Sequence, residues 1–430
     1  MKKNFYYNLG KHKLFPICRS LTGEGNKKTL NVIKKVCKKI KIYKFKSGSK
    51  VYDWKIPEEW NISDAYVKDK FNKKIINFKK NNLHLVGYSI PKKKYVNKIE
   101  LLKHIHSLPK EPNAIPYVTS YYKKYWGFCT THKEKKIIDS KYNKKDKFKI
   151  FINSKFNKKG HMLVGEYFLK GTSSQEIFIS TYICHPSLAN DNLSGILVSL
   201  NLINYFNKIK KLNKSIRFVF LPETIGAIAY LNKKIKELKK NVIGGFNLTC
   251  LGDENNYSFI PSKYNNSPSD FAITEVYKKL GIKARKYSFL DRGSDERQYN
   301  SPGIELPITT IFRSKFGNFK EYHTSLDNFS FITSKGLRES FNILKKAIII
   351  LMKKKYPITT TTCEPFMSKR NLYPTISKKD NSYASENMLN FLQYSDGRND
   401  LKKISKLIKL SLKETISCSR NLLKLKLIKY

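Results

Sequence analysis

The sequence lacks several features that would assign the protein to a specialised class. Its seven cysteines are odd in number and include no Cys-x-x-Cys pair, which argues against a disulfide framework or a cysteine-rich zinc site. The longest apolar run, Ala347–Met352, is far too short to span a bilayer. No sustained apolar segment follows the charged N-terminus, so a signal peptide is not expected. We therefore expect a cytoplasmic protein without membrane insertion.

Acidic residues and arginine are also scarce. The chain of 430 residues has 33 acidic and 84 basic residues, a formal charge of +51, and only ten of the basic residues are arginine. A general bias toward lysine accounts for this charge, and a surface that binds polyanions is the alternative interpretation. Because 40% of the residues are apolar, there is ample material for a large core, and the length favours two or three domains.

From about residue 160 the sequence alternates strand and helix patterns. Apolar runs at 177–183, 216–221 and 242–248 are typical of buried strands, and amphipathic helices are expected over 193–206 and 225–240. This alternation predicts a three-layer α/β/α domain with a mostly parallel central sheet, formed by residues 1–45 and 156–358. Further elements are a strand at 308–311 and helices over 27–44, 269–280 and 336–353.

Two other segments have a different character. Residues 46–155 contain short β-type runs separated by Pro- and Asn-rich turns, which indicates an inserted, mainly β module. After a Thr-rich linker, residues 376–430 hold three short helical patterns rich in lysine. This segment is interpreted as a small, winged-helix-like module through which nucleic acid could bind. A helical cap packed on the main domain is the alternative.

Polar residues stand directly after the predicted parallel strands, at the sheet edge where ligands bind in open α/β sheets. His185 follows the first strand and can offer an imidazole nitrogen to a metal. Asp191 opens the next helix, and Glu223 follows the second strand, where a carboxylate can act as general base or metal ligand. Helix capping by Asp191 and a favourable helix-dipole position for Glu223 are the structural alternatives.

Two later motifs add to this set. Asp295 and Glu296 stand between two arginines, Arg292 and Arg297, after a turn, where a surface salt-bridge cluster is the alternative interpretation. His323 precedes polar residues that could orient its ring, as partners of metal-bound imidazoles do. Two separated histidines with carboxylates at one sheet edge are the ligands that zinc favours in open catalytic sites.

The order of these motifs resembles the two-zinc aminopeptidases, and more closely a group of bacterial proteins with a zinc-aminopeptidase-like domain. The resemblance extends from about residue 15 to 375. It implies the phosphorylase/hydrolase-like fold, an inserted β module, a C-terminal winged helix and, for some members, a link to surface polysaccharide biosynthesis. The motifs that carry it are Arg-Ser-Leu-Thr-Gly-Glu-Gly (19–25), Val-Tyr-Asp-Trp-Lys-Ile-Pro-Glu-Glu-Trp (51–60), Ile-Pro-Tyr-Val-Thr-Ser-Tyr-Tyr (115–122), Ala-Asn-Asp-Asn-Leu-Ser-Gly (189–195), Glu-Thr-Ile-Gly (223–226), Gly-Ser-Asp-Glu (293–296) and Tyr-His-Thr-Ser-Leu-Asp-Asn (322–328).

The sequence departs from those peptidases at three acidic ligands. Their Ala-Asp-Asp-Asn motif places a zinc-bridging Asp where this chain has Asn190, their Glu-Glu pair is Glu223-Thr224 here, and their Asp after the third strand matches Thr249. A full two-zinc site is therefore not expected. The resemblance leaves one zinc ion held by His185, Asp191 and His323, or no metal.

We therefore predict a metal-dependent hydrolase of an amide or peptide bond, acting on a peptide or an acylated small molecule. Glu223 would be the catalytic base, with Asp295 and Glu296 as further catalytic carboxylates. Substrate contacts are expected from the side chains of Arg297, Tyr322 and Asn190. The alternative is a catalytically inactive relative that binds a ligand, DNA or a protein partner. The catalytic interpretation requires the imidazoles of His185 and His323 to lie within about 10 Å of each other, since each metal bond is ~2 Å long.

Overall fold

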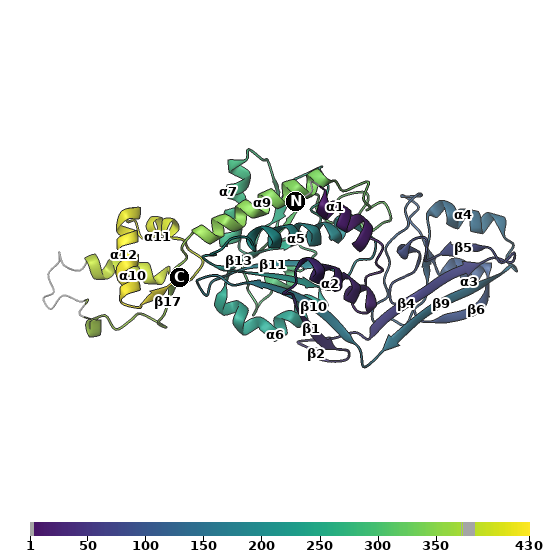
Figure 1. Ribbon diagram of the computed structural model, residues 1–430, viewed down its shortest axis with the longest axis horizontal. Coiled ribbons are helices and arrows are strands. Elements are labelled where there is room, and N and C mark those ends of the chain that lie inside the picture. Colours follow the sequence, from purple (N-terminus) through teal and green to yellow (C-terminus); the bar gives the residue numbers. More distant parts are fainter. Residues whose placement is uncertain (1–3, 371, 373–382) are drawn as a thin grey trace.

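A mixed eight-stranded sheet forms the centre of the protein (Figure 1). The structure is a computed structural model that describes residues 4–370, 372 and 383–430. The strand order is β1-β10-β12-β11-β13-β16-β14-β15, and β11 runs parallel to both β12 and β13. The strands are β1 (Lys41–Lys46), β10 (His161–Leu169), β11 (Glu176–Tyr182), β12 (Ser215–Leu221), β13 (Val242–Leu248), β14 (Ser258–Ile260), β15 (Arg285–Lys286) and β16 (Ile308–Phe312).

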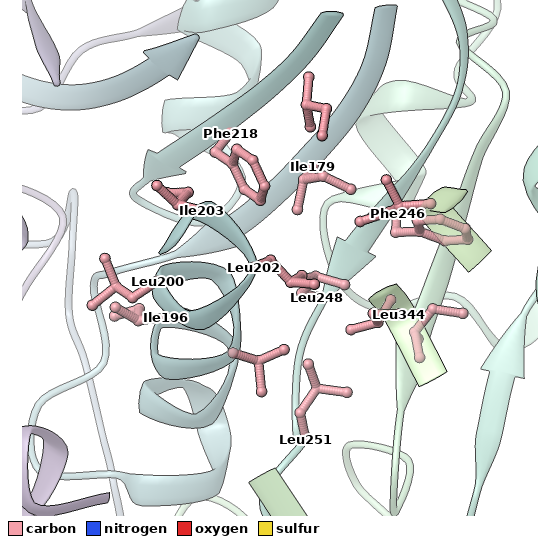
Figure 2. Packing of buried hydrophobic residues seen from close by; sticks show 14 of the residues in the cluster. Ile179, Ile196, Leu200, Leu202, Ile203, Phe218, Phe246, Leu248, Leu251 and Leu344 are labelled. Atoms are coloured by element: carbon pink, nitrogen blue, oxygen red, sulfur yellow. The ribbon is translucent and has the colours of Figure 1, made fainter. Parts of the chain in front are cut away.

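Helices cover both faces of this sheet. On one face α2 (Glu24–Val36), α5 (Ser194–Phe206), α7 (Pro268–Lys279) and α9 (Ser334–Lys353) contribute to one hydrophobic cluster, and α6 (Ile225–Asn241) packs on the other face (Figure 1). Figure 2 shows Ile179 and Phe218 from two neighbouring strands on the side of α5, and Phe246 from the next strand on the side of Leu344. Every residue of β11, β12 and β13 is buried, as expected for parallel strands covered on both faces. Three layers result, with the ends of the parallel strands free to carry polar groups.

A second sheet lies at one end of the molecule (Figure 1). It has the order β5-β4-β9-β6, and its two long strands, β4 and β9, pair antiparallel. The predicted module boundaries of 46 and 155 remain predictions, and β9 continues to Asn157. The elements are β2 (Lys50–Val51), β3 (Trp54–Lys55), β4 (Glu59–Lys68), β5 (Lys74–Asn77), β6 (Lys92–Asn97), α3 (Lys98–Lys103), β7 (Ile105–His106), β8 (Phe128–Cys129), α4 (His132–Lys141) and β9 (Lys147–Asn157).

The C-terminal part forms a small unit at the opposite end of the molecule (Figure 1). Its helices are α10 (Tyr383–Gln393), α11 (Leu401–Leu407) and α12 (Leu412–Lys424), and β17 (Ile358–Thr359) pairs with β18 (Ile428–Lys429). Phe391, Ile404 and Leu422 form a separate hydrophobic cluster between the helices. The predicted module starts at residue 376, and its first seven residues lie outside the described part of the chain.

The short remaining elements are α1 (Phe5–Leu9), η1 (Gly10–Leu14), η2 (Asn82–His84), η3 (Ala189–Leu193), η4 (Phe289–Asp291), α8 (Glu296–Tyr299) and η5 (Ser368–Arg370). No helix within the described residues combines the length and the apolar character needed to cross a bilayer.

One predicted element differs from the structure. The helix expected over 27–44 ends at Val36, and residues 41–46 instead form β1, which pairs antiparallel with β10. Its sequence, Lys-Ile-Tyr-Lys-Phe-Lys, can serve either a helix or an edge strand, because apolar and lysine side chains alternate irregularly. The exposed edge of β10, which lies far away in the sequence, decides between the two.

Candidate metal centre

His185, Asp191 and His323 meet in one place although His323 lies far from the other two in the sequence. Each offers one ligand atom, and these atoms lie within 4.8 Å of one another. The Nε2 atom of His323 is 3.0 Å from Oδ2 of Asp191, and the two imidazole centroids are 5.3 Å apart. The condition that the two rings lie within about 10 Å is therefore confirmed.

The sheet and one carboxylate position these ligands. His185 follows β11, and Asp191 belongs to the turn η3 that leads into α5. Asp327, four residues after His323, accepts hydrogen bonds from the backbone amides of Asn190 (2.6 Å) and Asp191 (2.9 Å). The buried carboxylate of Asp327 thus holds the turn that contains Asp191 against the loop that contains His323.

A loop of the inserted β module covers the two histidines. The ring of Tyr117 lies 5.1 Å from the ring of His185 and 5.1 Å from that of His323. The amide of Tyr117 donates to the carbonyl of His323 at 2.7 Å, and Pro116 forms a β-bridge with Thr324. This loop therefore pairs like a strand with the segment that carries His323.

Burial and charge prepare the three groups to act as ligands. Burial lowers the pKa of His185 to about 4, so its ring is neutral and has a free nitrogen lone pair at neutral pH. Burial alone would raise the pKa of Asp191, but His185, His323 and the hydroxyl of Tyr182 together hold it at about 2. A carboxylate and a neutral imidazole are the protonation states that bind zinc. The donor set therefore fits a metal ion.

Glu223 stands at the open side of this cluster. Its Oε2 atom lies 3.8 Å from Nε2 of His185, and its other oxygen accepts a hydrogen bond of 2.9 Å from Ser294. The side chains of Glu223 and His323 remain 21% and 35% exposed, so solvent or substrate can reach the cluster from this side. Burial, and then the negative charges of Asp295 and Asp191, raise the pKa of Glu223 well above its ordinary value.

Asp295 and Arg297 lie directly beside Glu223. One oxygen of Asp295 accepts a 2.7 Å hydrogen bond from the amide of Thr224, and burial raises the pKa of Asp295 to about 7. The exposed guanidinium of Arg297 donates to the hydroxyl of Thr224 at 2.6 Å. Thr224, the residue next to Glu223, is therefore hydrogen-bonded to Arg297 through its side chain.

Backbone strain is concentrated in these loops. Thr224, Cys250 and His323 have φ values of 63°, 49° and 54°, a region that residues other than glycine rarely adopt. Residues in such conformations cluster at functional sites, where the surrounding structure holds them in place. Thr224 directly follows Glu223, and His323 is itself one of the three ligands.

The structure does not bring every predicted residue to the cluster. Asn190 is fully buried, and its side chain donates to Asp253 (3.0 Å) and accepts from the amide of Gly252 (2.8 Å). Glu296 is also fully buried and accepts from two backbone amides and two side chains of its own loop and sheet. Both side chains are therefore held by hydrogen bonds inside the fold, and the substrate-binding part of Asn190 and the catalytic part of Glu296 stay predictions. Tyr322 does lie at the site, with its ring stacked 3.9 Å from that of His323.

Several residues of the site were not assigned from the sequence. The hydroxyl of Tyr182 donates a hydrogen bond to Asp191 and lies 2.6 Å from the hydroxyl of Thr249. Thr249, at the position of an acidic ligand in the two-zinc aminopeptidases, therefore forms a hydrogen bond with Tyr182. Arg19 donates to the carbonyl of His185 at 2.8 Å. Tyr117, which packs on both histidines, and Asp327, which fixes the turn of Asp191, also belong to the site. All four lie inside motifs that carried the resemblance or next to the predicted ligands, but nothing in a motif states which member points at a metal.

Two family models match the chain. A model described as a domain of unknown function (DUF4910) matches residues 7–354, and a winged helix-turn-helix model matches residues 354–430. The C-terminal unit is therefore a winged helix. A Clostridium acetobutylicum protein named for polysaccharide biosynthesis and an aminopeptidase-like domain is 38% identical over 402 residues, which is 93% of this chain and 90% of that protein.

Solved structures show the same fold. A Clostridium acetobutylicum protein described as a peptidase matches with a TM-score of 0.79 and 36% identity, over 99% of this chain and 96% of that one. A zinc aminopeptidase from Bacillus subtilis matches with a TM-score of 0.60 and 13% identity, over 82% of this chain and 95% of that one. The predicted zinc-aminopeptidase-like α/β fold is thus confirmed.

Proposed function

This chain belongs to the family described as a domain of unknown function (DUF4910), and we propose that it hydrolyses an amide bond with the help of one zinc ion. The observation that carries the proposal is the meeting of His185, Asp191 and His323 at the C-terminal ends of the parallel strands. Two imidazoles and a carboxylate, with one side open, form the ligand set of catalytic zinc sites. The aminopeptidase-like fold of the relatives supports an amide as the bond that is cleaved.

One ion is proposed because Asn190, Thr224 and Thr249 stand at the three positions where the resemblance expects acidic ligands. Thr224 and Thr249 stand where the resemblance expects carboxylates, and both hydroxyls have other partners, Arg297 and Tyr182. When bound, zinc supplies a Lewis acid that polarises a carbonyl and lowers the pKa of water. The residues around it then have to bind the substrate and move a proton.

Glu223 is proposed as the group that moves this proton. Its carboxylate lies beside His185 on the solvent-exposed side of the cluster, within reach of a water molecule placed there. Its raised pKa suits a base that takes a proton from the attacking water and returns it to the leaving amine. Ser294 holds one carboxylate oxygen and so leaves the other free for this task.

Asp295, Arg297 and Tyr322 are proposed to shape the substrate pocket. Asp295 fixes the strained backbone of Thr224, and so the position of Glu223. Arg297 and Tyr322 border the cluster and present a cation and an aromatic ring to the substrate. A peptide or an acylated small molecule fits this description. The name of the Clostridium relative suggests that polysaccharide biosynthesis supplies it.

Metal analysis of the purified protein tests the proposal. We expect one equivalent of zinc per chain, and we expect His185→Ala to lose it while His12→Ala, which removes an exposed histidine, retains it. Absence of zinc binding under all loading conditions would remove the proposed mechanism.

A second measurement separates catalysis from metal binding. Glu223→Gln should retain zinc but lower the hydrolysis rate of amide substrates at least about a hundredfold, the usual contribution of a general base. Equal rates for the two proteins would show that Glu223 does not transfer the proton.

A second function is proposed for the winged helix, namely binding of duplex DNA. Lys413, Arg420 and Lys424 are exposed on α12, at spacings of seven and four residues that place them on one helical face. Winged helix-turn-helix proteins insert such a helix into the major groove. The match of residues 354–430 to that family model supports this assignment.

Charge reversal tests the DNA proposal with a matched control. The triple change Lys413→Glu, Arg420→Glu and Lys424→Glu should abolish salt-dependent binding to a DNA duplex. Changing the exposed Lys34, Lys35 and Lys38 to Glu lowers the net charge equally and should leave binding intact. An equal loss in both triple variants would mean that only the overall charge of the chain attracts DNA.

A further inference from the structure

A large open cavity lies next to the candidate metal centre. It has a volume of about 890 Å³ and lies between the segment around Lys263 and the segment from Lys286 to Pro302. That volume is within the range of sites that bind small molecules. We call it the basic cavity, because Lys263, Lys286, Arg292 and Arg297 line it and no aspartate or glutamate does.

The four cations are available to a ligand. Within the described part of the chain, none of them forms an ion pair with a carboxylate, although many other lysines and arginines do. Three acidic groups stand on the same segment. Asp291 accepts a hydrogen bond from the amide of Ser288, and Glu296 is buried in its loop. Asp295 is buried beside the candidate metal centre, where it interacts with the charge of Arg297. The carboxylates of Asp295 and Glu223 offset part of the charge of Arg297. The other three cations, Lys263, Lys286 and Arg292, keep the basic cavity positively charged.

The lysine-rich composition does not account for this cavity. Arginine makes up only ten of the 84 basic residues, yet two arginines line the basic cavity. A drift toward lysine would not place arginines there. Guanidinium groups bind carboxylates and phosphates through two parallel hydrogen bonds, which an ammonium group cannot do.

Arg297 connects the basic cavity to the candidate metal centre. Its side chain lines the cavity, and its Nη2 atom lies 2.6 Å from the hydroxyl of Thr224, the residue directly after Glu223. A ligand that contacts Arg297 from the cavity side is therefore only one residue away from the proposed base.

The walls of the cavity are suited to a ligand that also has an apolar part. Tyr287 and Phe289 line it, and Leu290 is 83% exposed beside them. An apolar side chain so exposed at a cavity loses contact with water when a ligand enters, which favours binding. The guanidinium of Arg292 lies 5.2 Å from the ring of Phe289 and so stays close to this wall.

We propose that the basic cavity binds an anionic group of the substrate, a carboxylate or a phosphate, through Arg292 and Arg297, and so presents the scissile amide to Glu223. The inference rests on the proposed function, because it assigns the bound anion to the substrate of that site. It narrows the substrate to an amide whose neighbouring portion is negatively charged.

Calorimetric titration of the full-length, metal-free protein with glutarate and, separately, with inorganic phosphate tests this assignment at low ionic strength. Removing the metal prevents either anion from binding to zinc. We expect saturable binding of at least one probe, weakened about tenfold or more in both Arg292→Gln and Arg297→Gln, since charge-assisted hydrogen bonds are strong. Arg338→Gln changes an exposed arginine on α9 and should leave the affinity unchanged.

The outcomes are distinguishable from those of the metal experiments. Binding of glutarate alone assigns a carboxylate to the substrate, and binding of phosphate alone assigns a phosphate. Absence of saturable binding, or equal weakening by Arg338→Gln, would overturn the inference even if zinc binds as proposed. Specific anion binding in a protein that never binds zinc would instead refute the hydrolase mechanism and leave the anion site standing. Arg292→Lys keeps the charge and should recover only part of the affinity.

Discussion

The Nε2 atom of His323 lies 3.0 Å from Oδ2 of Asp191, although 131 residues separate them in the sequence. The contact joins the turn before α5 to the loop before α9, and His185 completes the group from the end of β11. Two loops, the one between β11 and α5 and the one between β16 and α9, therefore meet at the end of the central sheet. Because Asp191 is buried and ionised, it needs a cation or donors around it, and its histidine neighbours supply only part of that need.

Replacement of Asp191 by asparagine should remove the anionic ligand with little change in shape. We expect Asp191→Asn to weaken zinc binding about a hundredfold or more, since mutations of groups that only support ligands already cost 10–100-fold. Competition with a chromogenic zinc chelator measures the affinity. Asp139→Asn, at a carboxylate that is 65% exposed, should leave it unchanged. Similar affinities in the two variants would exclude Asp191 as a ligand.

The ring of Tyr117 should matter for zinc binding, and its hydroxyl should not. The ring packs on both histidines, whereas the hydroxyl points to the hydroxyl of Tyr121, 3.4 Å away. We expect Tyr117→Ala to lower zinc affinity about tenfold, because ring orientation supports metal binding. Tyr117→Phe should bind zinc as the native protein does. A large effect of the phenylalanine variant would point to a direct part for the hydroxyl.

Lys214 should make stability depend on pH between about 8 and 10.5. Burial lowers the pKa of this lysine to about 8, and its ammonium donates to the carbonyls of Met352 and Lys354. Below pH 8 the folded and unfolded states are both protonated, and the folded state bears the full cost of a buried charge. Above pH 8 Lys214 loses its proton in the folded state but keeps it in the unfolded state. The free-energy cost of the buried charge therefore decreases until the pH reaches the pKa of the lysine in the unfolded chain.

The comparison with Lys214→Met isolates this effect from other titrating groups. The free energy of unfolding of the native protein should rise relative to that of the variant by about 2 kcal/mol across this range, since one pKa unit is about 1.36 kcal/mol and some solvent reaches the side chain. Urea unfolding at a series of pH values measures it. A difference that does not change with pH would mean that Lys214 titrates normally.

Two glycines should respond very differently to alanine. A Cβ atom at Gly25 would lie 1.9 Å from the carbonyl oxygen of Cys18, so either backbone must move. A Cβ at Gly281 would meet nothing within 4 Å, and only its φ of 65° opposes the change. We expect Gly25→Ala to lower the free energy of unfolding by several kcal/mol, roughly the range of overpacking, and Gly281→Ala by about 1 kcal/mol. Equal effects in urea unfolding would contradict the packing argument.

The α/β domain was predictable because its strands carry a local signal. β11, β12 and β13 read as apolar runs that are long enough for a strand and too short for a helix, and the helices between them show a period of 3.6 residues. By contrast, β1 and β10 depend on each other across more than a hundred residues of inserted chain. No local pattern states that such a partner exists.

The site was predictable in part for the same reason. His185, Asp191 and Glu223 stand at strand ends, where the topology of a parallel sheet forces side chains together. Asn190 and Glu296 also stand there, but a one-residue step in a turn decides whether a side chain faces the cleft or the interior. The hydrogen bonds of Asn190 to Gly252 and Asp253 fix that step, and they join segments that the sequence cannot place side by side.

The β-bridge between Pro116 and Thr324 joins the inserted β module to the loop of the α/β domain that carries His323. Deletion of the insertion would therefore also uncover both imidazoles and remove the backbone pairing that holds the loop that carries His323. Related chains that differ in this insertion should then differ in metal affinity, even where all the metal ligands are identical.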